Sequence, residues 1–302
     1  MPLYRFADGL VDSEHPLPGL AAVSASPQTA TIRVQWSEDP SPDLPAPSYR
    51  WTGRYGLSLH ETSAGPAWRF IDGSAMRWAA NSRQLEVHLA TPDSFPLVAD
   101  GLVRRILPRL AVVDGALVLH AAAVAAPTGG ILLCGTSGCG KSTLAAGLAG
   151  AGWPLLSDDF AVVEMRQWPP RCLPAAAAVC VWHDVTEALA SQSIESKPMA
   201  GYKSKYWHIT RASDVPCSLT AIWHLDGLPS GDVEVVRLTP YNLIDCLWRH
   251  IVHFNPGDRL ARRVLGHRLM RLSEIPLFRV RYPRNLAKLE HVASTLTHVT
   301  SP

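Results

Sequence analysis

Hydrophobic and polar residues alternate with a period of two along several stretches of the first 96 residues. Such alternation predicts strands with one buried face. The stretches are TIRVQW (31–36), YRWTGRYGLSLH (49–60) and QLEVHLA (84–90). Residues 37–48, SEDPSPDLPAPS, predict a loop, because proline lacks the backbone donor that a strand or helix needs. We therefore expect a small β-rich N-terminal domain over residues 1–96.

The period changes in the next segment, FPLVADGLVRRILPRLA (95–111). Leu97, Leu102, Ile106 and Leu110 recur at near-helical intervals, which predicts a helix connecting two parts of the chain. Pro108 is expected to end or kink that helix, because it removes a backbone hydrogen bond.

Short apolar runs followed by helical stretches characterise the rest of the chain. Strands alternating with helices around a glycine loop indicate an α/β nucleotide-binding core, which we place over residues 97–302. The segments are VLHAAAV (118–124), GILLC (130–134), KSTLAAGLAGAG (141–152), WPLLSDDFAVVE (153–164), LTAIWHL (219–225), VEVVRL (233–238) and predicted helices at 241–252 and 284–297.

Composition excludes some classes of protein. The chain has 302 residues, 47% of them hydrophobic, so it is long enough to bury a large core and is not expected to be disordered. Lys and Arg number 28 against 26 Asp and Glu, a formal charge of +2. Such a small net charge gives no chain-wide footprint for nucleic acid, and a nucleic-acid partner is disfavoured.

The sequence also suggests a compartment. The start of the chain lacks a signal-peptide pattern, and the most apolar region, 117–134, is interrupted by polar residues, glycine and proline, so no membrane span is expected. Cysteines without a C-x-x-C pair in a long chain suggest reduced thiols and a cytoplasmic protein. They are Cys134, Cys139, Cys172, Cys180, Cys217 and Cys246.

The segment GTSGCGKS (135–142) matches the phosphate-binding motif G-x-x-x-x-G-K-[ST] at every fixed position. An apolar strand before it and a helix after it are the context that the motif requires. Its glycines let backbone N–H groups approach phosphates at the positive end of a helix. The residues expected to bind ATP are Gly135, Thr136, Ser137, Gly138, Cys139, Gly140, Lys141, Ser142 and Thr143.

Two positions of this loop have distinct chemical roles. Lys141 would neutralise the β and γ phosphates, and Ser142 would offer its hydroxyl to Mg²⁺. The chain contains no N-K-x-D guanine signature, which favours ATP over GTP.

Adjacent carboxylates, Asp158 and Asp159, follow the apolar stretch 153–157. One could hold Mg²⁺ and the other could accept the proton of an attacking hydroxyl. Like charges this close raise one pKa, which suits a base. A solvated turn is the alternative, and the neighbouring phosphate loop favours the functional interpretation. His120 is either a core histidine or, if its strand lies beside that of the Asp pair, a group that orients a carboxylate or contacts a phosphate.

The segment from Leu119 and His120 through the glycine loop to Ser157-Asp158-Asp159-Phe160 resembles the catalytic core of HPr kinase/phosphorylase in order and spacing. The wider chain is similar to the smaller HPr-kinase-related proteins that accompany lasso-peptide biosynthesis, which phosphorylate the C-terminal serine of the precursor peptide. The stretches that carry this wider similarity are YRFADGLVDSEHPLPGL (4–20), CLPAAAAVCVWHDVTEAL (172–189), SLTAIWHL (218–225) and IPLFRVRYPRNLAKLEHVASTL (275–296).

The resemblance implies an α/β P-loop fold of the phosphoenolpyruvate-carboxykinase-like kind and transfer of the ATP γ-phosphoryl group to a serine hydroxyl. In that family's terms Asp158 would be the base, and Asp159 and Ser142 would serve the metal. Lys141 would bind the phosphates, and His120 would support the carboxylates. The family's signature stretch with its Glu and Arg has no counterpart in LPAAAAVCVW (173–182), which weakens the expectation of the reverse phosphorylase reaction and of HPr as substrate.

The expected partner is a peptide or protein with an acceptor serine, and a homo-oligomer stays open. A kinase of a small-metabolite hydroxyl would use the same residues. A protein that binds ATP and transfers nothing is the third hypothesis, although such a sensor needs no base.

Several basic residues and histidines have more than one interpretation. Lys203 and Lys205 could close over phosphates or a peptide, or face solvent. Ten Lys and Arg against two acids occupy residues 249–288, which could attract an acidic peptide or a phosphate, or form the solvated face of helices. His250 and His253 lack a nearby cysteine or carboxylate, which favours a structural role over a metal site.

Overall fold

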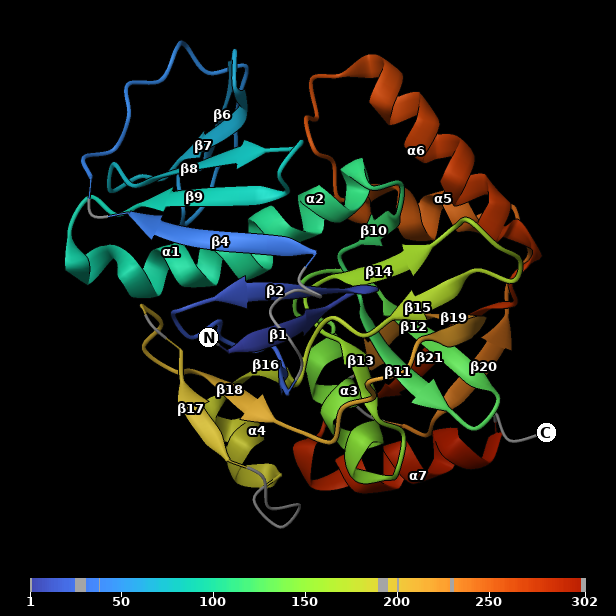
Figure 1. Cartoon of the computed structure of the whole chain (residues 1–302). Coiled ribbons are helices and arrows are strands. Elements are labelled where there is room, and N and C mark those ends of the chain that lie inside the picture. Colours follow the sequence, from blue (N-terminus) through green and yellow to red (C-terminus); the bar gives the residue numbers. More distant parts are fainter. Residues whose placement is uncertain are drawn as a thin grey trace.

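The computed structural model describes residues 2–24, 31–37, 39–189, 195–199, 201–228 and 231–299. These residues form a mixed α/β structure with two nine-stranded sheets and one three-stranded sheet (Figure 1). The first large sheet uses strands that all precede residue 89, and the second uses strands from residue 117 onward. A helical segment connects the two sheets.

The N-terminal sheet has the strand order β3-β1-β2-β4-β9-β8-β7-β6-β5. Strands predicted at 31–36 and 84–90 are confirmed as β4 and β9, whereas the stretch 49–60 is two strands, because a turn with positive φ at Gly53 and Gly56 divides it. The bounds are β1 Leu3–Phe6, β2 Gly9–Ser13, β3 Ala22–Val23, β4 Ile32–Ser37, β5 Tyr49–Arg50, β6 Ser58–Thr62, β7 Gly65–Arg69, β8 Ala75–Ala79 and β9 Gln84–His88.

The connecting helix continues past the proline that was expected to end or kink it. After the 3₁₀ turn Pro92–Ser94, helix α1 spans Phe95–Gly101, a π-helical turn spans Leu102–Ile106, and α2 spans Leu107–Val113. Pro108 lies in the first turn of α2, directly after the π-helical turn. The wider turn shifts the local hydrogen-bonding register where proline has no N–H to donate. The helix continues beyond Pro108 as far as Val113.

The second large sheet has the order β10-β14-β15-β19-β12-β11-β13, and β21 joins it by pairing with β19 and β20. Strands β12, β19 and β21 run parallel to one another, and most other pairs are antiparallel. The bounds are β10 Leu117–Leu119, β11 Ala122–Ala126, β12 Gly129–Cys134, β13 Leu155–Ser157, β14 Ala161–Glu164, β15 Arg171–Leu173, β19 Cys217–Leu228, β20 Glu234–Arg237 and β21 Leu277–Pro283.

Helices cover both faces of this sheet. On β12, Ile131 and Leu133 pack in the cluster that contains α3 and α7, whereas Leu132 belongs to the cluster that contains α5 and α6. A strand buried on both faces is a continuous apolar run, as in GILLC. The helices are α3 Lys141–Gly150, α5 Asn242–Leu247, α6 Arg259–Arg271 and α7 Leu289–Val299, with 3₁₀ turns at Trp248–His250, Leu272–Glu274 and Leu286–Lys288.

The stretch 118–124 was expected to be one strand carrying His120, and that expectation is wrong. Leu119 ends β10, which pairs with β14, and Ala122 begins β11, which pairs with β12 and β13. His120 lies in the break, where its backbone N–H donates to the carbonyl oxygen of His250 at 2.6 Å. Strands β10 and β11 therefore lie at different places in the sheet, although only two residues separate them.

A small sheet lies beside the phosphate-loop helix. Its order is β16-β18-β17, and helix α4, His183–Ala188, follows β16 directly. The strands are β16 Ala178–Trp182, β17 Ser196–Pro198 and β18 Lys205–Ile209.

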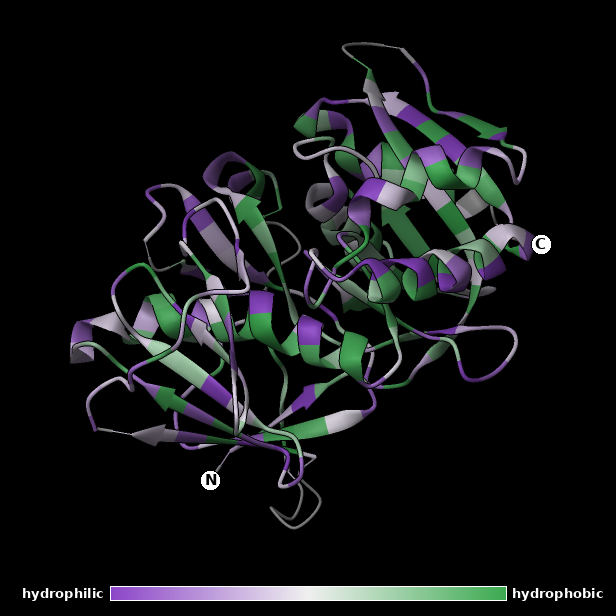
Figure 2. Ribbon diagram, turned by 90° about the horizontal axis from the view of Figure 1, so that it is seen from above, coloured by the Kyte–Doolittle hydropathy of each residue, from purple (hydrophilic) through white to green (hydrophobic). Residues whose placement is uncertain are grey.

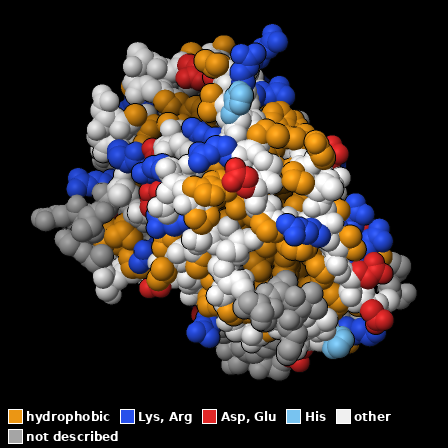
Figure 3. All heavy atoms as spheres, turned by 90° about the vertical axis from the view of Figure 1, so that its right-hand side faces the viewer, with side chains coloured by type: hydrophobic (Ala, Val, Ile, Leu, Met, Phe, Trp, Pro, Cys, Tyr) orange, Lys and Arg blue, Asp and Glu red, His pale blue; other side chains and the backbone are white. Residues whose placement is uncertain are grey.

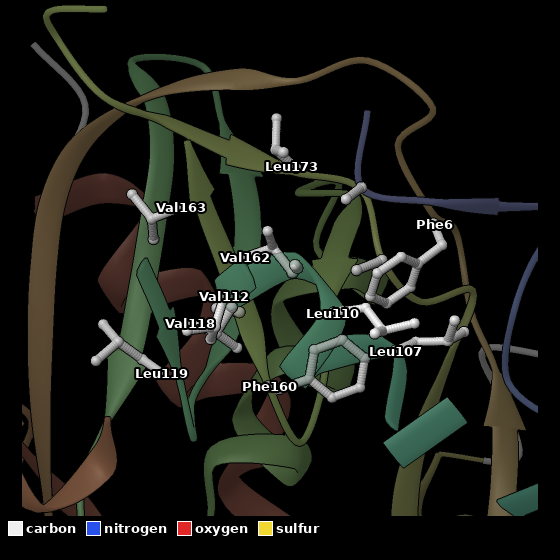
Figure 4. Packing of buried hydrophobic residues seen from close by; sticks show 14 of the residues in the cluster. Phe6, Leu107, Leu110, Val112, Val118, Leu119, Phe160, Val162, Val163 and Leu173 are labelled. Atoms are coloured by element: carbon white, nitrogen blue, oxygen red, sulfur yellow. The ribbon is translucent and has the colours of Figure 1, made fainter. Parts of the chain in front are cut away.

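The main hydrophobic core continues from one large sheet to the other. The rings of Phe6 in β1 and Phe160, which precedes β14, are 5.8 Å apart. Figure 4 shows Phe6 and Phe160 with Leu107 and Leu110 of α2 between the halves of the molecule. In the lobe that holds the C-terminus, hydrophobic residues lie along the central strands (Figure 2).

Two further observations bear on the sequence predictions. All six cysteines are free thiols in this structure. Among the described residues, no helix has the length and apolar character needed to cross a membrane.

Candidate functional site

Strand β12, a glycine loop and helix α3 form the turn that contains residues 135–143. Gly135, Gly138 and Gly140 adopt φ values of +142°, +79° and +99°, which favour glycine. A Cβ atom at Gly140 would lie 2.5 Å from the hydroxyl oxygen of Tyr282, and one at Gly135 would lie 2.8 Å from the carbonyl oxygen of Leu225. Both glycines are therefore required by close contacts as well as by their backbone angles.

Lys141, the first residue of α3, is buried inside this loop. Its Nζ donates to the carbonyl oxygens of Gly135 at 2.9 Å and Thr136 at 3.1 Å. The first two residues of the loop thus bind the ammonium group of Lys141 through their carbonyl oxygens. A cation in this position at a helix N-terminus makes the turn attractive to anions.

Asp158 contacts the residue that follows the lysine. Its Oδ1 accepts from the Ser142 hydroxyl at 2.8 Å, and its Oδ2 accepts from the backbone N–H of Cys180, also at 2.8 Å. Burial raises the pKa of Asp158, the hydrogen bond from Cys180 opposes that rise, and the charge of Asp159 adds to it. The net effect is a pKa above the ordinary value, which suits a group that takes a proton.

Asp159 has different neighbours, although it is adjacent in sequence. Its Oδ2 accepts from Arg104 Nε at 2.9 Å and from Arg105 at 3.3 Å. Burial alone would raise the pKa of Asp159, but Arg104, Arg105 and His120 together hold it well below its usual range. The backbone at Asp159 has a φ of +65°, and the two adjacent carboxylates have different partners. The structure therefore brings Ser142 to Asp158, while the carboxylate of Asp159 faces arginines.

His120 supports the acidic pair through the backbone. Its Nδ1 lies 2.6 Å from the carbonyl oxygen of Asp159 and 3.5 Å from that residue's Oδ1. A carbonyl oxygen only accepts, so Nδ1 carries the proton of this hydrogen bond. The imidazole thus fixes the turn that separates the two carboxylates.

Behind Arg104, contacts continue into the N-terminal half of the chain. A carboxylate oxygen of Asp100 lies 3.8 Å from Arg104 and accepts from the hydroxyl of Tyr55 at 2.5 Å. Asp100 is 3% exposed, so this pair of contacts is shielded from water. A buried row of polar groups thus runs from Tyr55, in the turn between β5 and β6, to Asp159.

These groups meet at a cavity of about 370 Å³. Part of the lining is polar and comes from the loop, the acidic pair and Arg104. Another part includes the exposed ring of Trp182 and apolar residues of α4 and α7. Of the residues predicted from sequence, the cavity is lined by His120, Ser137, Gly138, Gly140, Lys141, Ser142, Thr143, Asp158 and Asp159. Gly135, Thr136 and Cys139 belong to the loop but do not line this cavity.

Sequence reasoning missed Arg104 and Trp182. Arg104 is an arginine on the buried side of a largely apolar helix, which is the one local signal that could have singled it out. Lys205 lines the cavity and lies 4.8 Å from the ring centre of Trp182, whereas Lys203 does not line it.

The cavity fits a nucleoside triphosphate with a divalent cation. Ser142 and Asp158 place two oxygen ligands 2.8 Å apart at the start of α3. Mg²⁺ is usually held by one or two carboxylates together with substrate phosphates. The loop cation suits the phosphates, and the apolar part of the wall suits the base.

Neither a scan of protein-family models nor a search of curated protein sequences found a match. The solved structures that resemble the chain include the HPr(Ser) kinase/phosphatase from Coxiella burnetii, at 14% sequence identity and a TM-score of 0.30. The likeness covers 60% of this chain and 97% of that one.

Proposed function

We propose that the chain is an ATP- and Mg²⁺-dependent kinase that transfers the γ-phosphoryl group to a serine hydroxyl of a peptide or protein. The observation that carries this proposal is the hydrogen bond between Ser142 and Asp158 at the first turn of the phosphate-loop helix, beside the buried Lys141. A hydroxyl, a carboxylate and an ammonium group in one cavity are the parts that phosphoryl transfer requires.

The chain's own residues would act mainly by position and charge. Backbone N–H groups of the glycine loop and the Lys141 ammonium would hold the phosphates, with the Lys141 hydrogen bonds to Gly135 and Thr136 giving way to phosphate oxygens. Ser142 would hold Mg²⁺, which neutralises phosphate charge when bound. Asp158, with its raised pKa, would take the proton of the acceptor hydroxyl.

Asp159 has contacts that support another role than the metal ligand expected from the sequence. As a metal ligand it would have to release Arg104 and Arg105. We propose that it instead holds Arg104 at the cavity wall, where a guanidinium can stabilise charge on the transferred group. Asp158, the carboxylate that contacts Ser142, would then face the metal as well as the acceptor.

The acceptor is proposed to be a serine at the end of a ribosomal peptide, such as a lasso-peptide precursor. This finer proposal rests on the resemblance of the sequence alone. A cytoplasmic location and a function without nucleic acid or membrane partners belong to the same proposal.

Mass spectrometry of a serine-ended peptide after incubation with the protein and Mg-ATP tests the kinase. We expect the peptide to gain one phosphoryl group with the parent protein and none with Asp158→Asn, which should still bind nucleotide. Asp184→Asn is the matched control, because Asp184 lines the same cavity and its carboxylate accepts from its neighbour's backbone N–H. Transfer by Asp158→Asn near the parent rate would show that Asp158 is not the base.

A further inference from the structure

A second cavity, of about 280 Å³, adjoins the phosphate loop. It shares Thr136 with that loop, and its other walls come from β19, β21, α5 and the 3₁₀ turn that follows α5. Its lining residues are Thr136, His224, Asn242, Asp245, Cys246, Arg249, His250 and Arg279.

The position of this cavity in the sheet is one where α/β proteins bind ligands. His224 of β19 is level with Cys134, the last residue of β12, and Arg279 of β21 is level with His224. The three strands are parallel, and the phosphate loop leaves from the carboxyl end of β12. Ligands of open α/β sheets bind outside the carboxyl ends of strands. Here that end belongs to β12, since His224 and Arg279 lie within β19 and β21.

Two guanidinium groups in this cavity lack a partner. Within the part of the chain that the structure describes, the guanidinium groups of Arg249 and Arg279 make no ion pair or hydrogen bond. Nearby arginines differ: Arg281 pairs with Asp226 at 3.2 Å, and Arg271 donates to the carbonyl oxygen of Met165. In this cavity, therefore, two arginines of the basic stretch noted in the sequence have guanidinium groups that can bind a ligand. On the face seen in Figure 3, Lys and Arg side chains lie at the top, along the left-hand side and at the right-hand edge, among hydrophobic side chains.

The charge of the cavity matches a single anionic group. Arg249 and Arg279 face one acid, Asp245, so one positive charge is in excess. Burial lowers the pKa of His224, and burial followed by the charge of Lys141 lowers the pKa of His250 to about 4, so both imidazoles are neutral near pH 7. His224 Nδ1 is buried without a partner among the described residues and can bond to the same ligand.

The second cavity lies close to Lys141, the group that would hold the phosphates. The ring centres of His250, which lines this cavity, and His120, which lines the first one, are 6.4 Å apart. Lys141 also donates to the carbonyl oxygen of Thr136. In this motif the lysine reaches the β and γ phosphates, and its contact with Thr136 links the site of those phosphates to the second cavity.

We propose that this second cavity binds a carboxylate of the acceptor, so that the substrate carries its carboxylate close to the hydroxyl that is phosphorylated. A free C-terminal serine has this chemistry, as does a small hydroxy acid. The proposal deepens the proposed kinase function and rests on it. Carboxylates form paired hydrogen bonds with guanidinium groups, and binding there would set the distance between the hydroxyl and Asp158.

Calorimetry can test the cavity without phosphoryl transfer. The probes are a short serine-ended peptide with a free carboxylate and the same peptide as its C-terminal amide, each added in the presence of Mg²⁺ and a non-hydrolysable ATP analogue. We expect the acid to bind about tenfold more tightly than the amide, since hydrogen bonds to charged groups have this effect. Arg279→Gln and Arg249→Gln should each remove most of that difference.

Arg281→Gln is the matched control, because it removes an arginine of the same strand that is already paired with Asp226. Arg249 is exposed, so its variant keeps the test valid if Arg279→Gln fails to fold. Equal binding of acid and amide would overturn the proposal, as would an equal loss in Arg281→Gln. If the acid and the amide bind equally, and inorganic phosphate binds the parent protein but not Arg279→Gln, the cavity is a phosphate site and the carboxylate proposal is wrong.

The two proposals fail separately. Tight binding of the acid through Arg279 without any transfer would contradict the kinase and leave the carboxylate cavity standing. Equal transfer to acid and amide peptides would support the kinase and overturn the carboxylate cavity.

Discussion

At the scale of single residues, the pairing of Arg104 with Asp159 decides how the two adjacent carboxylates differ. The sequence indicates both aspartates, because an acidic pair after an apolar run near a phosphate loop is a local pattern. It does not indicate Arg104, since that contact joins residues 55 positions apart and exists only after folding. Which aspartate meets Ser142 depends on the positive φ of Asp159, which no sequence pattern shows.

Replacing Arg104 by glutamine should destabilise the protein in a pH-dependent way. The side chains of Arg104 and Asp159 are 6% and 12% exposed, and breaking a buried pair costs about 3 kcal/mol of unfolding free energy. The pKa of folded Asp159 lies below its unfolded value of about 4. The pair therefore stabilises the fold fully above that pH and less as the pH falls further.

Chemical denaturation at pH 7 and at pH 3 measures this difference. We expect a large loss of stability in Arg104→Gln at pH 7 and a smaller one at pH 3. Arg166→Gln is the control, because Arg166 and Asp8 form an exposed pair that should contribute little. A loss for Arg104→Gln that is the same at both pH values would contradict the electrostatic explanation.

At the scale of elements, the glycine loop was predictable and the surroundings of His120 were not. The loop is specified by eight consecutive residues, and its strand and helix follow from an apolar run and a helical pattern. The run around His120 is apolar throughout, so periodicity could not show that it changes strand partners. Likewise, the π-helical turn before Pro108 lets the helix continue where proline alone predicts an end.

Gly140→Ala and Gly152→Ala separate the role of the loop from the cost of backbone strain. Both glycines have φ of +99°, so alanine should cost each about 1 kcal/mol of stability. A Cβ at Gly140 would clash with the Tyr282 hydroxyl, whereas one at Gly152 meets nothing within 4 Å. Only Gly140→Ala should weaken ATP binding, by about tenfold, because the N–H groups that face the phosphates lose alignment.

Fluorescence titration with an ATP analogue would measure both affinities. Adding Tyr282→Phe to Gly140→Ala should restore part of the binding, since the hydroxyl is the atom that the new Cβ meets first. If Gly152→Ala weakens binding equally, the contact with Tyr282 does not explain the requirement for glycine.

At the scale of the whole molecule, the two sheets are separate in sequence but share a core. A boundary after residue 96 stays a prediction, and it falls just inside α1. Backbone hydrogen bonds cross it, from Ala7 to Pro174 and from Ala177 to Gly19, each at 2.8 Å. The sequence indicated a change of hydrophobic period at this point. It could not show how much apolar surface the halves bury against each other.

Residues 97–302 expressed alone should therefore lack fixed tertiary packing. Removing the first sheet exposes apolar surface of α2 and β14 that Phe6 and its neighbours cover. We expect helical circular dichroism in the far ultraviolet, a weak near-ultraviolet signal and binding of a hydrophobic dye. Adding residues 1–96 as a separate chain should restore the near-ultraviolet signal. A sharp, cooperative melt of the fragment alone would contradict this expectation.

The row of buried groups from Tyr55 through Asp100 and Arg104 to Asp159 has an evolutionary consequence. A chimera that takes its first sheet from a relative would keep the phosphate loop and still lose Arg104's support unless the donor also has a tyrosine at this place. Among relatives, substitutions at Tyr55, Asp100 and Arg104 should therefore be correlated. The first sheet is constrained by the chemistry of a site to which it contributes no cavity-lining residue among those described.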